Sequence, residues 1–265
     1  METHIEFLGV ATYRITNREG KVILIDPFLD ENPVSPVKVK DLDRVDLILV
    51  THLAMDHMGD AEAIAKKFGC PVCCGGEVRH WLVHRGVPGD NVRGMCWGLQ
   101  VVEAGIRVRS VVSMHTSARV MDNGQFISGP PMGFIVYADP GVRIYQSGDS
   151  AIFGDLKLIG ELYRPNIGLI PCTLPSEEFL VAHGHINLHM NEMTAEEAAL
   201  AALWLRVEYA LPCHYFKAAG NPDVERFLAL VNNLHSDEGP VAKPIVLEPG
   251  DTFVYPSAKI LRRRK

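Results

Sequence analysis

The sequence has little that would place the protein in a membrane or on nucleic acid. No apolar run approaches the roughly 18 to 20 residues that are needed to cross a bilayer. Acidic residues outnumber basic ones, 32 to 26, and the formal net charge is -6. The chain therefore lacks the basic surface on which general binding to nucleic acid depends. We expect no membrane and no nucleic acid among its partners, and a small molecule as its substrate or ligand.

Marks of secretion are also missing. The segment Met1 to Glu6 has no positive stretch followed by an apolar core, which is the pattern of a secretory signal. We therefore expect a cytoplasmic protein, in which the 6 cysteines are thiols rather than a disulfide framework. Cys70 and Cys73 have a C-x-x-C spacing, but no second pair accompanies them. We interpret them as small core residues that follow a helix over Ala61 to Phe68.

Neither a linker-like stretch nor an internal repeat divides the chain. With 265 residues, 47% of them hydrophobic and 22% charged, it can bury one large core. We predict a single domain over residues 1–265, and the sequence is compatible with a homo-oligomer. The basic run Arg262 to Lys265 is expected to be a frayed, solvated tail.

Strand and helix signals alternate along this domain. The segments Ile5 to Leu8 and Thr12 to Ile15 are typical of an antiparallel pair of strands. Thr194 and Glu197 form a capping box ahead of an Ala-rich helix, and Asn221 precedes a proline that suits the first position of another helix. The pattern is that of an α/β protein.

The most informative segment is Thr51 to Asp60, with the sequence THLAMDHMGD. It follows the apolar run Val45 to Val50, which we interpret as a buried strand, so its polar residues begin in a loop at the rim of a sheet. His52, Asp56 and His57 offer imidazole and carboxylate ligands that suit zinc, manganese or iron. A metal site is the leading hypothesis, and histidines that only cap or brace a loop are the alternative.

Three further candidate ligands each lie just past a predicted strand. They are His115 after Val108 to Met114, Asp149 after Val142 to Tyr145, and His214 after Ala210 to Cys213. Ligands at the ends of several strands can converge on one rim when the strands share a sheet or belong to two packed sheets.

This arrangement resembles the metallo-β-lactamase superfamily, from about Ile5 to Tyr255, and in particular its small metal-dependent hydrolases related to L-ascorbate-6-phosphate lactonase. Weaker signatures in the same order support the resemblance: Ile23 to Phe28, Ser128 to Phe134 and Met193 to Ala198. The resemblance implies an αββα sandwich, in which two packed mixed β-sheets are flanked by helices.

The family motif is His-x-His-x-Asp-His, but Ala54 stands where the second histidine would be. The resemblance implies two half-sites that share a bridging carboxylate, Asp149. One half-site would be complete with Asp56, His57 and His214, whereas the other would keep only His52 and His115. It also implies that Asp56 and Asp149 are the catalytic carboxylates that position the attacking water.

Three interpretations of Ala54 remain open. The protein can bind a single ion at the complete half-site. It can recruit a substitute ligand from the segment that contains His183, His185 and His189, which we interpret as a lid or pocket wall, with a solvated loop as the alternative. Ala54 can also be an engineered substitution that disables the site.

The resemblance implies a hydrolase with one or two divalent ions, zinc first and manganese or iron next. A metal-activated water would attack a lactone, a cyclic amide or an ester-like small molecule. A missing ligand argues against phosphodiesters, which suit two ions, but a phosphodiesterase or nuclease-type enzyme remains an alternative, as does an inactive metal-binding homologue. Asp26, at the end of its strand, is expected either to orient a ligand imidazole or to serve as a turn residue before Pro27.

Overall fold

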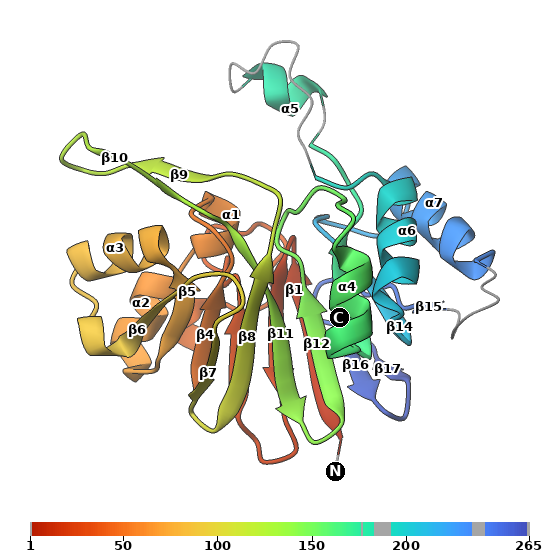
Figure 1. Cartoon of the computed structure of the whole chain (residues 1–265), viewed down its shortest axis with the longest axis horizontal. Coiled ribbons are helices and arrows are strands. Elements are labelled where there is room, and N and C mark those ends of the chain that lie inside the picture. The colour runs from red at the N-terminus through yellow and green to blue at the C-terminus, as the bar shows by residue number, and fades with distance from the viewer. Residues whose placement is uncertain (1, 176, 183–191, 235–241, 264–265) are drawn as a thin grey trace.

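The computed structural model describes residues 2–175, 177–182, 192–234 and 242–263. Two β-sheets pack face to face, and helices cover the outer side of each sheet (Figure 1). The helices α2 and α3 lie against the first sheet, whereas α4, α6 and α7 lie on the side of the second. The predicted αββα sandwich is therefore confirmed.

The eight-stranded first sheet is mixed. Its strands in spatial order are β17 (Lys259–Leu261), β16 (Thr252–Tyr255), β1 (Thr3–Gly9), β2 (Thr12–Thr16), β3 (Val22–Ile25), β4 (Leu47–Val50), β5 (Val72–Gly75) and β6 (Val92–Met95). The meander from β1 to β3 is antiparallel, as the sequence predicted, and the strands from β3 to β6 are parallel.

The second sheet has seven strands. In spatial order they are β15 (Lys243–Pro244), β14 (Tyr209–Cys213), β13 (Ile167–Pro171), β12 (Val142–Gln146), β11 (Met132–Asp139), β8 (Ile106–Val112) and β7 (Gln100–Glu103). A separate hairpin of β9 (Ser117–Val120) and β10 (Phe126–Gly129) projects beyond the sheets near α1 (Figure 1).

The helices are α1 (Met55–Met58), α2 (Ala61–Phe68), α3 (Gly76–His84), α4 (Leu156–Tyr163), α5 (Glu177–Ala182), α6 (Ala195–Leu205) and α7 (Pro222–Asn232). Two short 3-10 turns span Val39–Asp41 and Gly89–Asn91. Two of the expected helix starts are confirmed: Thr194 and Glu197 close a capping box at α6, and the Asn221 side chain accepts from two backbone N–H groups of α7. No helix in these described ranges has the length and apolar character that crossing a membrane requires.

Strand β3 shows how the sequence builds two cores. Ile23 and Ile25 point into the space between the sheets, whereas Leu24 faces the helices α2 and α3. Successive side chains of a strand point to opposite faces, so a strand covered on both sides is apolar throughout. Cys73 and Cys74 divide between the same two cores, and burial raises the pKa of both thiols. This burial supports the interpretation of the C-x-x-C segment as core.

Strand direction brings the predicted ligands to one edge. Strands β12, β13 and β14 are parallel to one another. Strand β8 runs in the same direction, because both β8 and β12 are antiparallel to β11. The carboxyl ends of β8, β12 and β14 therefore meet at one edge of the second sheet, where His115, Asp149 and His214 follow them.

The polar residues after β4 begin in a loop, as expected, but two local details differ from the expectations. The metal-ligand segment does not continue as a loop after β4, because residues Met55–Met58 form the single helical turn α1 with Ala54 as its N-cap. The basic tail is not free up to its described end, since the Arg262 guanidinium pairs with Asp251 and the Arg263 backbone N–H donates to Asp251 Oδ1 at 3.0 Å.

Candidate metal centre

The structure brings the six predicted ligands together at the rim of the two sheets. Two groups have ligand atoms that all lie within 4.8 Å of one another. The four-ligand group contains Asp56, His57, Asp149 and His214, and the three-ligand group contains His52, His115 and Asp149. Asp149 belongs to both groups, as a bridging carboxylate would.

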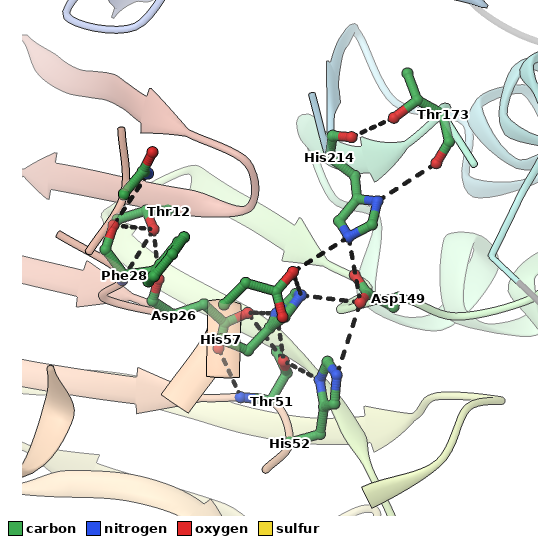
Figure 2. A network of polar contacts seen from close by, with 11 residues as sticks. Thr12, Asp26, Phe28, Thr51, His52, His57, Asp149, Thr173 and His214 are labelled. Carbon is green, nitrogen blue, oxygen red and sulfur yellow. Dashed lines mark hydrogen bonds and ion pairs between the residues drawn. The ribbon is translucent and has the colours of Figure 1, made fainter. Parts of the chain in front are cut away.

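Distances around Asp149 describe a compact centre (Figure 2). Its Oδ2 lies 2.9 Å from His57 Nε2, 3.5 Å from His214 Nε2 and 3.7 Å from His52 Nε2. Asp56 Oδ2 lies 3.6 Å from His214 Nε2 and 3.8 Å from His57 Nε2. Three imidazoles thus direct the same ring nitrogen toward one carboxylate.

The donor atoms fit a divalent cation. His52 Nε2 and Asp149 Oδ1 are buried without a hydrogen-bond partner, and the buried His57 Nε2 has only the Asp149 carboxylate beside it, at 2.9 Å. A buried polar atom without a partner destabilises a protein by about 1 to 3 kcal/mol. A cation in each of the two groups would give these atoms a partner, and nitrogen and oxygen donors of this kind are ligands of zinc and similar metals.

Asp26 orients His57. The Asp26 Oδ2 atom lies 2.8 Å from His57 Nδ1 and accepts the Thr51 hydroxyl at 2.9 Å, while Oδ1 accepts the Thr51 backbone N–H at 2.8 Å. Burial raises the pKa of Asp26, although its hydrogen bonds and His57 oppose that rise. When His57 donates its Nδ1 proton to this hydrogen bond and a metal displaces the proton on Nε2, the Nε2 lone pair is available as a ligand. Of the two roles expected for Asp26, this geometry favours the orienting one.

His214 is held by residues that the sequence analysis did not single out. The His214 Nδ1 atom lies 3.3 Å from the Thr173 carbonyl oxygen, and the Thr173 hydroxyl donates to the His214 carbonyl. The His214 backbone N–H donates to the Val10 carbonyl at 2.7 Å. His214 has φ 70° and Val10 has φ 57°. Non-glycine residues rarely adopt the left-handed region, so surrounding contacts must hold both residues there.

A buried link joins the two loops that carry the three-ligand group. The Leu53 backbone N–H, next to His52, donates to Ser117 Oγ at 3.1 Å, and the Ser117 hydroxyl donates to Glu77 Oε1 at 2.6 Å. Ser117 lies two positions after His115. Glu77 stands in the first turn of α3, and burial raises its pKa. This link fixes the loop of His52 relative to the loop of His115.

Although Ala54 removes one histidine of the family motif, the three-ligand group can still hold a metal ion. His52, His115 and Asp149 supply three ligands, and a catalytic zinc site commonly has three protein ligands and one open position. The suggested substitute ligands His183, His185 and His189 lie outside the described residues. Glu192, which the sequence analysis missed, is buried with Oε2 unpartnered and interacts electrostatically with Asp149, His214 and His115.

Charges within the centre shift the pKa values of its members. Burial acts to lower the pKa of His214, but Asp149 and Asp56 outweigh burial and raise it to about 9. Burial acts to raise the pKa of Asp56, but His57 and His214 lower it to about 2. The pKa of His52 falls well below its usual value because of burial and the nearby His57. His52 is therefore a neutral imidazole, which is the form that binds metal.

The two cysteines near the rim are not part of the centre. Cys213, next to His214, is buried in the core between the sheets and faces Tyr13, and burial raises the pKa of its thiol. Cys172 is buried in the same core. Neither belongs to a described group that could hold a metal.

Comparisons with known proteins agree with this geometry. A family model described as beta-lactamase superfamily domain matches residues 21–215. The chain is 37% identical over 214 residues to a UPF0173 metal-dependent hydrolase of Rubrobacter xylanophilus, which covers 80% of this chain and 81% of that protein. It is 31% identical over 252 residues to a UPF0173 metal-dependent hydrolase of Methanobrevibacter smithii, covering 95% and 96% of the two chains.

A solved structure has the same fold. Igni18, described as a novel metallo hydrolase from the archaeon Ignicoccus hospitalis, matches with a TM-score of 0.74 and 26% identity, over 96% of this chain and 99% of that one. The resemblance inferred from the sequence is confirmed. Because the family model matches residues 21–215 and a relative is 37% identical over 80% of the chain, this protein belongs to the metallo-β-lactamase superfamily, among the UPF0173 metal-dependent hydrolases.

Proposed function

We propose that this metal-dependent hydrolase cleaves a carbonyl substrate, namely a lactone, a cyclic amide or an ester-like small molecule, at a centre of two zinc ions. The substrate class comes from the resemblance to the lactonase branch, because two ions would serve a phosphodiester equally well. The observation that carries the proposal is the set of buried donor atoms on His52, His57 and Asp149 that lie together in two groups of potential ligands. They belong to two groups that share Asp149, and a zinc ion held by the three-ligand group would have a fourth position available for water. Zinc is preferred to manganese or iron because four of the six donors are imidazoles.

When bound, the metal would lower the pKa of a coordinated water and polarise the carbonyl under attack. The protein's own residues position the water and the metal ligands. Asp149 spans both groups and would hold the water between them, while the Asp26 carboxylate fixes the ring of His57. The Asp56 side chain is the more exposed of the two catalytic carboxylates, at 33% against 5% for Asp149, so it faces incoming substrate.

The test combines metal content with turnover. We expect hydrolysis of lactones and esters by protein that carries zinc, and no hydrolysis by His214→Ala. His84→Ala, on the exposed end of α3, is the matched control and should retain full activity. Turnover of phosphodiesters with no turnover of lactones, cyclic amides or esters would replace the proposed substrate class. Zinc binding without turnover on any panel would contradict the carbonyl proposal as a whole.

A further inference from the structure

Four exposed apolar side chains lie close in sequence to the ligands or to Thr173, one in the helical turn α1 and three in loops. They are Met55 (58% exposed), Met114 (49%), Leu174 (37%) and Phe216 (55%), and we call them the apolar mouth. Met55 and Met114 each directly precede a ligand, Asp56 and His115. Phe216 lies two positions after a ligand, and Leu174 follows the threonine whose carbonyl oxygen contacts the His214 ring.

Few charged residues flank the ligands in the sequence, although the buried Glu192 interacts electrostatically with Asp149, His214 and His115. Within two positions of the six ligands and of Thr173, all of them described residues, the only charged side chains are Asp56 and Asp149 themselves. Recognition of a phosphate or carboxylate normally uses an arginine or lysine side chain. The first cationic side chains beyond that window are those of Lys217, three positions after His214, and Arg119, four positions after His115.

A pocket of about 410 Å³, lined in part by Met55, has apolar walls and a mainly acidic charged lining. Phe28 and Met58 give it apolar walls, and its charged lining consists of three carboxylates and one guanidinium: Asp30, Glu31, Asp60 and Arg119. The guanidinium of Arg119 already stacks on the ring of Trp81, at 4.4 Å from its centroid. An anionic substrate group would meet more negative than positive charge here.

We propose that the substrate carries an uncharged apolar group beside the bond that is cleaved, and that the apolar mouth binds this group. The inference rests on the proposed hydrolase function. It narrows the expected substrates to those with acyl chains or aromatic acyl groups and excludes phosphorylated lactones. Methionine side chains are unbranched and polarisable, so they can adapt to chains of different shape.

The first test measures kcat/KM for 4-nitrophenyl esters from acetate to octanoate and for γ-lactones of increasing alkyl length. Full burial of one methylene corresponds to a gain of roughly fourfold, so we expect at least a tenfold rise from acetate to hexanoate. Phe216→Ser and Met114→Ser should flatten this dependence. Leu162→Ser, at an equally exposed apolar position on α4, should leave it unchanged.

A second readout does not require turnover. Calorimetric binding of alkyl hydroxamates to the zinc-loaded protein should strengthen with chain length, and Phe216→Ser should remove the trend. Equal binding of all chain lengths, or a preference for a phosphorylated lactone, would overturn the inference but not the hydrolase proposal. Conversely, zinc binding and a hydroxamate trend without any ester or lactone hydrolysis would overturn the carbonyl proposal alone.

A protein partner is the competing occupant of the apolar mouth. If Phe216→Ser converts a dimer to a monomer in size-exclusion chromatography and leaves the chain-length dependence intact, the apolar mouth is an interface between copies and the inference is wrong. An unchanged oligomeric state together with a flattened dependence supports a substrate-binding role.

Discussion

At the scale of single residues, the first prediction concerns Asp26, which orients the metal ligand His57. We expect Asp26→Asn to weaken metal binding by about 10- to 100-fold, because an amide cannot accept from both Thr51 and His57 in the way that the carboxylate does. A titration against a competing chelator measures this change. Asp43→Asn, on an exposed carboxylate, serves as the control. Unchanged affinity in Asp26→Asn would contradict the orienting role.

The second prediction concerns the protonation of His214. Its pKa is raised to about 9, mainly by Asp149 and Asp56 against the opposing effect of burial, so below that pH the ring carries a proton that a metal must displace. Metal affinity of the four-ligand group should therefore rise by at least tenfold per pH unit up to about pH 9, and the slope should fall above it. The same chelator competition at pH 6.5 to 9.5 tests this trend, and a flat profile would contradict it.

The ligands could be predicted from sequence because each follows an apolar run, so a strand end and a chemical role coincide in one short segment. Thr173 and Glu77 could not, because their roles arise from contacts across 41 and 40 positions of the chain. The left-handed backbone of Asp26 and His214 was equally hidden, since neither residue type requires that conformation.

At the scale of elements, the third prediction concerns the hydrogen bond that links Glu77 of α3 to Ser117 of β9. Ser117→Ala leaves the Leu53 N–H and the Glu77 carboxylate without their shared partner in the interior. We expect a loss of about 1 to 3 kcal/mol in the free energy of unfolding. We also expect weaker binding at the three-ligand group, with the four-ligand group preserved.

Stepwise zinc titration separates the two groups, and urea denaturation measures the stability. Ser257→Ala, on an exposed side chain, is the control. Equal weakening of both metal equivalents would mean that Ser117 contributes to stability only, and that it does not specifically position the His52 and His115 loops.

Element boundaries followed the sequence where local signals were strong. Helix α2 ends at Phe68, where Gly69 adopts φ 63°, and α6 begins after the capping box at Thr194. The turn α1 was missed because four residues are too few to show helical periodicity. Arg262 was misjudged because its partner, Asp251, belongs to a loop that only the folded sheet brings close.

Over the whole molecule, the alternation of strand and helix signals pointed to α/β, but the packing of two sheets came from the family resemblance. Local periodicity cannot pair strands that lie far apart, such as β1 with β16. Nor could the sequence establish that two groups of ligands converge around Asp149. That convergence depends on the parallel direction of β8, β12 and β14 and on the position of β4 in the facing sheet.

The most direct measurement of the central claim is metal content per chain by elemental mass spectrometry, on protein purified without added metal or chelator. Ala54→His should be measured in parallel, because it restores the histidine of the family motif. We predict close to two equivalents in both proteins, with the second equivalent held more tightly in Ala54→His. One equivalent in the parent that rises to two in Ala54→His would contradict a functional three-ligand group, and no bound metal in either protein would contradict the metal centre altogether.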